Sequence, residues 1–282
     1  MSAPAPPPPV TAEGMLPRGD QRIHWEESGT PDGVPTLYLH GGPGGRLTPG
    51  YRRNSPAGSA RIIGLSQRGT GRSAPSAGAP GPVDLSAQTT GDLVADLEAL
   101  RVHLGIEAWI VQGVSWGSTL ALAYAQAHPD RALGLVLFAV TTTSRREVEW
   151  ITEGVAALYP EAWDAFAALA EEVDEHARRF ACLVTHYWAH DGFVADWAVP
   201  WGASPGSGLL GGMARLSGLP GVLIHGLRDV SGPALTAWEL HRAWPGSELI
   251  VVEEEGHGGP RMAEHWRAAV SRLVDASRPG PQ

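Results

Sequence analysis

Serine, aspartate and histidine can together carry out nucleophilic acyl transfer, and in this chain each occurs in a short motif that contains glycine. Residues 113–117 read Gly-Val-Ser-Trp-Gly, which places Ser115 between two glycines. Asp229 ends the run His-Gly-Leu-Arg-Asp, and His257 lies between two further glycines. In such a triad the serine attacks, the histidine takes and returns the proton, and the aspartate orients the imidazole. We therefore expect Ser115, Asp229 and His257 to be catalytic.

The motif around Ser115 predicts a nucleophile elbow only if a strand precedes it and a helix follows. The mainly apolar run at 109–112 predicts the strand, and the apolar pattern at 118–127 predicts the helix. The turn between them is so tight that side chains two residues before or after Ser115 would collide with the backbone. The same turn directs the N-terminus of the helix at the serine, where its partial positive charge favours an oxyanion.

A second glycine-rich run follows an early predicted strand at 36–40. It reads His40-Gly41-Gly42-Pro43-Gly44. A loop of this kind can turn a backbone N–H toward the nucleophile, and the residue after the serine supplies another. We expect the N–H groups of Gly42 and Trp116 to form an oxyanion hole, with Gly41 beside the substrate and His40 as a structural hydrogen-bonding residue.

The elements that must position these residues alternate between strand and helix. Further strands are predicted at 21–27, 61–65, 133–140, 221–225 and 248–252, and further helices at 89–104, 234–244 and 261–275. Such alternation predicts an α/β fold with a mostly parallel central sheet flanked by helices. The chain order serine, aspartate, histidine is that of an α/β-hydrolase triad.

Residues 145–212 interrupt the alternation with predicted helices at 147–158, 161–173 and 174–188, followed by a Gly/Pro/Ser-rich tract. We interpret this segment as a helical cap inserted over the carboxyl edge of the sheet. The predicted organisation is a disordered Pro-rich tail over 1–13, the first part of the core over 14–144, the cap over 145–212, and the second part of the core over 213–278.

Composition narrows the possible partners and cofactors. The 282 residues carry a net charge of -9, and every basic residue is arginine, with no basic cluster. This argues against nucleic acid or an anionic membrane as a partner. The single cysteine, Cys182, permits neither an internal disulfide nor a cysteine-based metal site, and it favours the cytoplasm. His186 and His190 have helical spacing but no third ligand nearby in sequence, so we expect no metal and no cofactor.

Taken together, these motifs resemble the proline iminopeptidase (prolyl aminopeptidase) group of α/β-hydrolases. The resemblance rests on residues 40–44, Gln67-Arg68-Gly69-Thr70-Gly71-Arg72-Ser73, 113–126 with His128-Pro129, His225-Gly226 with Asp229, 237–240 with 243–245, and Gly256-His257. It covers nearly the whole predicted core. It implies the same catalytic roles for Ser115, Asp229 and His257 and the same oxyanion role for Gly42 and Trp116.

The chain departs from that family where the family recognises its substrate's amine. Phe138 stands at the position of an arginine, Thr185 at the position of a glutamate, and the cap is shorter; Ser66 also replaces a structural aspartate. An ammonium buried without a paired carboxylate costs several kcal/mol. The cap holds eleven acidic and four basic residues. From it and the neighbouring core, the side chains expected to reach the substrate are Phe138, Glu149, Glu153, Tyr187, Trp188 and Asp191.

These observations predict a serine hydrolase that cleaves a small amide or ester with a partly apolar acyl group. The expected partner is a small molecule or a short peptide. Two alternatives share the triad: a prolyl aminopeptidase that releases N-terminal proline, and a biosynthetic acyltransferase or cyclase in which another nucleophile replaces water. A binding protein without catalytic activity is disfavoured because it would have no physical need for all three triad residues.

Overall fold

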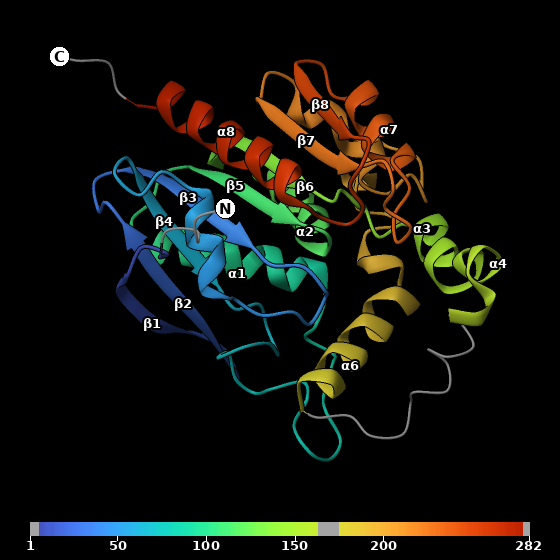
Figure 1. Cartoon of the computed structure of the whole chain (residues 1–282). Helices are drawn as coiled ribbons and strands as arrows, with labels where there is room; N and C mark the ends of the chain where they lie inside the picture. Colours follow the sequence, from blue (N-terminus) through green and yellow to red (C-terminus); the bar gives the residue numbers. More distant parts are fainter. Residues whose placement is uncertain (1–5, 163–174, 279–282) are drawn as a thin grey trace.

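The computed structural model describes residues 6–162 and 175–278. Its centre is an eight-stranded sheet in the order β1-β2-β4-β3-β5-β6-β7-β8 (Figure 1). The pairs β1–β2 and β2–β4 are antiparallel, and every other pair is parallel. The strands are β1 (Val10–Arg18), β2 (Gln21–Gly29), β3 (Val34–Leu39), β4 (Ala60–Leu65), β5 (Trp109–Val114), β6 (Ala132–Phe138), β7 (Gly221–Gly226) and β8 (Ser247–Val252).

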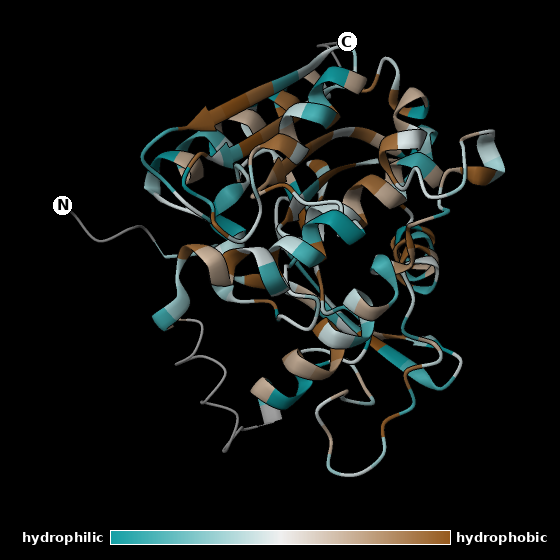
Figure 2. Ribbon diagram, turned by 90° about the vertical axis from the view of Figure 1, so that its right-hand side faces the viewer, coloured by the Kyte–Doolittle hydropathy of each residue, from teal (hydrophilic) through white to brown (hydrophobic). Residues whose placement is uncertain are grey.

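Helices cover both faces of this sheet. One face packs against α1 (Thr90–His103), α2 (Trp116–Ala127) and α7 (Leu235–Ala243), and the other against α8 (Pro260–Ala276) and the short 3₁₀ helix η1 (Pro49–Asn54). Neighbouring strand residues alternate between the two cores, so that successive apolar side chains are all buried. The central strands are accordingly hydrophobic along much of their length (Figure 2). The predicted mostly parallel sheet with flanking helices is confirmed.

The N-terminal edge of the sheet differs from the prediction. β1 begins at Val10 and pairs with β2 along its whole length, so the disordered tail predicted over 1–13 is too long by at least four residues. Residues 1–5 lie outside the described residues. The strand escaped prediction because Gly14 and Pro17 interrupt its apolar pattern, and an edge strand tolerates a proline that a central strand would not.

The segment predicted as a cap is helical in the described parts of its first half, and turns connected by short 3₁₀ segments follow. It contains α3 (Arg145–Glu149), the π-helical turn η3 (Trp150–Gly154), α4 (Val155–Leu158) and α6 (Glu175–Ala189), followed by 3₁₀ turns at Asp191–Phe193, Val199–Trp201 and Leu210–Leu216. Most of the helix predicted at 161–173 lies outside the described residues. These helices stand beside the carboxyl ends of the central strands (Figure 1), and Leu183 and Tyr187 of α6 join the buried core.

None of the described helices is both long and apolar enough to cross a membrane.

Candidate active site

Ser115 occupies a sharp turn between β5 and α2. Its backbone has φ 54° and ψ −124°, a strained conformation for a residue other than glycine. A Cβ added to Gly113 would lie 2.2 Å from the carbonyl oxygen of Gly117, and one added to Gly117 would lie 2.2 Å from that of Leu39. Both positions therefore require glycine, and the backbone between them holds the serine side chain clear of the sheet.

Asp229 and His257 come from the loops that follow the neighbouring parallel strands β7 and β8. The two loops touch directly. The N–H of Arg228 donates to the carbonyl oxygen of Glu255 at 2.9 Å, and a Cβ on Gly226 would lie 2.1 Å from the carbonyl oxygen of Gly256. The absence of a side chain at Gly226 thus allows the loop that carries Asp229 to pack directly against the loop that carries His257.

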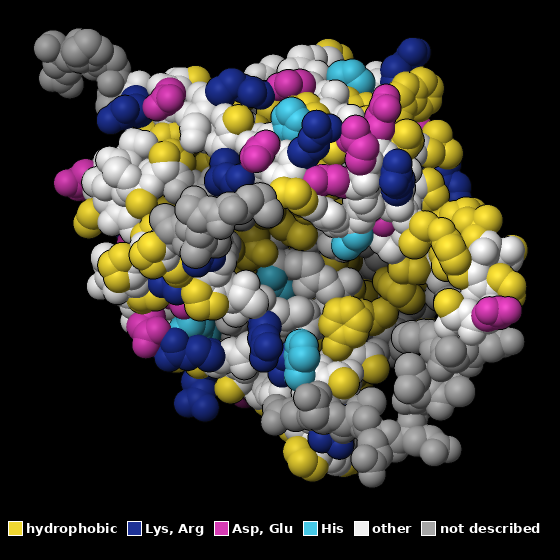
Figure 3. Space-filling view, viewed as in Figure 1, with side chains coloured by type: hydrophobic (Ala, Val, Ile, Leu, Met, Phe, Trp, Pro, Cys, Tyr) yellow, Lys and Arg dark blue, Asp and Glu magenta, His cyan; other side chains and the backbone are white. Residues whose placement is uncertain are grey.

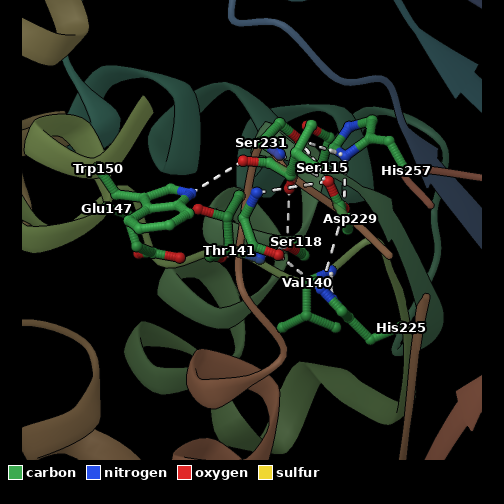
Figure 4. A network of polar contacts seen from close by, with 12 residues as sticks. Ser115, Ser118, Val140, Thr141, Glu147, Trp150, His225, Asp229, Ser231 and His257 are labelled. Carbon is green, nitrogen blue, oxygen red and sulfur yellow. Dashed lines mark hydrogen bonds and ion pairs between the residues drawn. The ribbon is translucent and has the colours of Figure 1, made fainter. Parts of the chain in front are cut away.

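The His257 ring is hydrogen-bonded to the Asp229 carboxylate, with 2.7 Å between Nδ1 and Oδ2 (Figure 4). The Asp229 side chain is only 1% exposed, whereas that of His257 is 50% exposed. Burial disfavours the carboxylate charge, but hydrogen bonds from His257 and Ser231 outweigh it and lower the pKa of Asp229. Because Nδ1 is bound to an anion, Nε2 is the ring nitrogen left to accept a proton.

Ser115, Asp229 and His257 line one pocket of about 420 Å³. Within the part of the chain described, no hydrogen bond joins Ser115 to His257. Catalytic hydrogen bonds of this kind often become short only when substrate is bound. The structure therefore brings the three predicted catalytic side chains to one site, with the histidine–aspartate half already bonded.

The candidate oxyanion donors adjoin the serine. Trp116 begins α2, where backbone N–H groups have no partner within the helix. Gly41 packs against Ser115, since a Cβ built on it would lie 3.1 Å from the Cβ of Ser115. Gly42, at φ 130°, lines the same pocket as Trp116. The loop also contacts α6, whose Phe180 backbone would lie 3.0 Å from a Cβ on Gly44.

Gln67 joins the two halves of this oxyanion region. Its side-chain oxygen accepts a hydrogen bond from the indole N–H of Trp116 at 2.9 Å, and its side-chain amide donates to the carbonyl oxygen of His40 at 2.8 Å. Its backbone N–H donates to Nε2 of His40 at 3.2 Å, which leaves Nδ1 to donate to the Gly41 carbonyl oxygen at 3.0 Å. The sequence placed Gln67 in a family motif without indicating this role.

We predict that the protein loses stability as the pH falls from 7 to 5. Burial lowers the pKa of His40 to about 4, while the pKa of histidine in an unfolded chain is about 6.5. Between these values the unfolded chain binds the proton and the folded chain does not, so the free energy of unfolding falls as the pH falls. His40 alone contributes a loss of about 2 kcal/mol. Burial lowers the pKa of His24 and His225 as well, with the same sign.

Urea unfolding at pH 7 and pH 5, followed by tryptophan fluorescence, measures this change. Equal or greater stability at pH 5 would contradict the assignment of neutral buried histidines.

The wall of the pocket beyond the triad is mainly apolar. It is formed by the β6–α3 connection, by α3 and η3, and by α6, with the side chains Val140, Thr141, Thr143, Val148, Ile151, Phe180 and Trp188. The space-filling view shows the molecule hollowed between the core and the cap helices, with hydrophobic side chains along the hollow (Figure 3). Trp188, predicted to reach the substrate, is among the lining residues.

Phe138 and Tyr187 do not line this pocket, contrary to the prediction. Phe138 points to the core on the α8 face, where its ring centroid lies 4.9 Å from that of Trp266. Tyr187 is 1% exposed and packs on the opposite core, 4.6 Å from the ring of Trp116. Because successive side chains of a strand point to opposite faces of the sheet, Phe138 points away from the site. Tyr187 lies on the face of α6 that packs against Trp116, behind the pocket wall.

The acidic side chains singled out from the cap also lie elsewhere. Glu149 and Glu153 are exposed on the outer side of α3 and η3, because Val148 and Ile151 occupy the face toward the pocket. Asp191 pairs with Arg145 at 2.8 Å and lines a separate pocket of about 470 Å³. None of these three carboxylates is placed to meet a substrate at Ser115.

Glu147 is the acidic residue that the sequence analysis missed. It is 6% exposed and lines the pocket that Ser115, Asp229 and His257 also line. Its Oε2 accepts hydrogen bonds from the N–H and hydroxyl of Thr142, at 3.0 and 2.6 Å, and from the N–H and hydroxyl of Ser144, at 3.1 and 3.0 Å. The Ser-x-x-Glu spacing of a capping box was the available signal, since it places the carboxylate at the start of the helix.

One cluster of metal-ligand types occurs among the described residues, at Glu13, His24 and Glu26, remote from the triad in the fold. Arg72 already binds both oxygens of Glu13, at 2.5 and 3.1 Å, and its positive charge opposes a cation there. His186, the other candidate considered from sequence, is hydrogen-bonded through Nε2 to the carbonyl oxygen of Gln88 at 3.0 Å. None of these side chains lines the pocket of Ser115.

Comparisons with known proteins agree with this architecture. A family model described as alpha/beta hydrolase fold matches residues 34–200. The chain is 40% identical to a probable proline iminopeptidase from Streptomyces coelicolor, over 86% of this chain and 89% of that protein. Two solved structures, each 20% identical, share the fold. VinJ has a TM-score of 0.70 over 95% of this chain and 99% of its own. The proline iminopeptidase of Mycobacterium smegmatis has a TM-score of 0.64 over 94% and 98%.

Proposed function

Because the chain belongs to the α/β-hydrolase fold family as a proline iminopeptidase-like member, we propose that it is a serine hydrolase acting through an acyl-enzyme on Ser115. The observation that carries this proposal is the 2.7 Å bond between His257 Nδ1 and Asp229 Oδ2, in the pocket that Ser115 also lines. Such a pair leaves Nε2 free to remove the serine proton. The strained turn at Ser115 supports the same role.

In the proposed reaction, Oγ of Ser115 attacks the carbonyl carbon of an amide or ester while its proton passes to Nε2 of His257. The backbone N–H groups of Trp116 and Gly42 stabilise the negative oxygen. The carbon–leaving-group bond then breaks, and His257 returns the proton to the departing amine or alcohol. Water then attacks the acyl carbon while His257 takes a proton from it. The bond between the acyl carbon and Oγ of Ser115 breaks, His257 returns that proton to Oγ, and the acid is released.

The pocket favours a substrate with an apolar acyl group. Val148, Ile151, Phe180 and Trp188 supply apolar surface next to the triad. Among the described lining residues, the carboxylates are those of Asp229 and Glu147. Asp229 is bonded to His257. Oε2 of Glu147 already accepts four hydrogen bonds, and Oε1 accepts one, from the N–H of Thr142 at 3.3 Å. Among the described lining residues, a buried ammonium would therefore have to share the Glu147 carboxylate with these donors, which makes a free amine next to the acyl carbon costly.

A second candidate is release of N-terminal proline. The specific observation in its favour is the name of the relatives: besides the Streptomyces protein, a proline iminopeptidase from Arabidopsis thaliana is 36% identical over 83% of this chain. The two candidates share every step at Ser115 and differ in whether the substrate carries a free amine.

A panel of matched substrates distinguishes them. We expect proline arylamide with an acylated nitrogen, and simple acyl esters, to be cleaved at least about tenfold faster than unblocked proline arylamide. The control is Ser115→Ala with each substrate. Faster cleavage of unblocked proline would favour the iminopeptidase instead. Product analysis with an added amine or alcohol would reveal acyl transfer in place of hydrolysis.

A further inference from the structure

Ser231, two residues after Asp229, touches both members of the histidine–aspartate pair. Its Oγ lies 2.6 Å from Oδ1 of Asp229 and 2.8 Å from Nδ1 of His257 (Figure 4). Its backbone N–H also donates to Oδ1 of Asp229, at 3.0 Å. Together with the 2.7 Å bond between His257 and Asp229, these contacts close a ring of three hydrogen bonds among three side chains.

The protons in this ring can be placed by elimination. An ionised carboxylate only accepts, so the single hydroxyl proton of Ser231 goes to Oδ1 of Asp229. The Ser231 oxygen then presents only lone pairs to the His257 ring. Nδ1 must therefore carry the proton and share it between Oδ2 of Asp229 and Oγ of Ser231. This arrangement leaves Nε2 unprotonated on the side of the ring that would serve Ser115.

The contact between Ser231 and His257 matters because the His257 side chain is exposed. Half of the His257 side chain is open to solvent, whereas Asp229 is buried. A single hydrogen bond to Oδ2 leaves the ring free to swing about that contact. Oγ of Ser231 is a second acceptor for the same N–H, and the backbone of the loop that carries Asp229 holds it in place. This second contact restricts the motion of the ring.

We propose that Ser231 is a positioning residue that fixes the tautomer and orientation of His257 through this shared hydrogen bond. The proposal deepens the proposed function and rests on it for its catalytic consequence. The competing explanation is that Ser231 only closes the turn at Asp229, in which case its hydroxyl would matter for stability and not for the imidazole.

The test compares Ser231→Ala with Ser231→Thr, which keeps a hydroxyl, and with Ser231→Cys as a second variant should alanine not fold. The matched control is Ser207→Ala, because Ser207 lines the separate pocket and its buried Oγ has no hydrogen-bond partner among the described residues. Two readouts are taken on the full chain: the rate constant for phosphonylation of Ser115 by a fluorophosphonate, and the low-field proton NMR signal of His257 Nδ1–H.

We expect Ser231→Ala to react about tenfold more slowly and to shift or lose the low-field signal, with Ser231→Thr and Ser207→Ala close to wild type. The wild-type rate and signal in both Ser231→Ala and Ser231→Cys would overturn the proposal. If wild type is not phosphonylated at Ser115, the proposed function fails, and the NMR signal alone then tests the contact between Ser231 and His257. An unchanged signal in Ser231→Ala and Ser231→Cys overturns the proposal for Ser231. An altered signal in these variants supports it.

Discussion

Replacing Ser115 with alanine is expected to reduce kcat by about a millionfold, to the level of background hydrolysis. The change removes the oxygen that forms the acyl-enzyme and leaves the Cβ that the strained turn already accommodates. Residual acceleration would come only from binding and the oxyanion donors. The measurement is steady-state turnover of the best substrate found in the matched panel, at enzyme concentrations high enough to detect slow hydrolysis.

Two controls accompany this measurement. The thermal unfolding midpoint of Ser115→Ala should stay close to that of wild type, because neither Cβ nor backbone is altered. Ser118 provides a matched alanine substitution in the same turn region, since its hydroxyl bonds the carbonyl oxygens of Ser115 and Thr141; it should lower stability but keep measurable turnover. A Ser115→Ala protein that retains a tenth of wild-type activity would exclude Ser115 as the nucleophile.

Asp229→Asn is expected to lower kcat by about ten-thousandfold with little change in fold. Asparagine has the shape of aspartate, but its amide N–H₂ can donate to Nδ1 of His257. That bond would favour the tautomer with the proton on Nε2, which cannot accept the serine proton. The carboxylate is ionised across the physiological range because hydrogen bonds from His257 and Ser231 outweigh its burial and lower its pKa.

Asp196→Asn is the matched control, because Asp196 also accepts a backbone N–H, from Gly206 at 2.8 Å, but lies in the cap away from the triad. Turnover near neutral pH, measured for both variants alongside wild type, separates the two roles. A loss below tenfold in Asp229→Asn would show that His257 does not depend on this carboxylate.

The core of the fold was predictable because its signals are local. Strands β3 to β8 are short apolar runs between glycine or proline turns, and α1, α2, α7 and α8 follow helical spacing. β1 was missed because an edge strand needs to bury little, so its sequence carries no alternating apolar pattern. The eight-strand order, with β4 between β2 and β3, depends on contacts between distant segments and was not predicted.

The candidate site divides in the same way. Ser115, Asp229 and His257 lie in motifs whose glycines are required within a few residues, so the sequence marks them directly. Which residues line the pocket depends on the face of the helix or strand on which each side chain lies. A shift of two residues along α3 separates Glu147, which lines the pocket, from Glu149, which faces solvent. The contact of Ser231 with His257 joins loops 26 positions apart and left no sequence signal.

Mapping a covalent adduct tests the central claim most directly. The full-length protein would be treated with a fluorophosphonate and digested, and the modified residue identified by tandem mass spectrometry. We predict a single adduct on Ser115, lost in Ser115→Ala and formed far more slowly in Asp229→Asn. An adduct on Ser118 or Ser231, or no adduct on a folded protein that turns over substrate, would contradict the proposed mechanism.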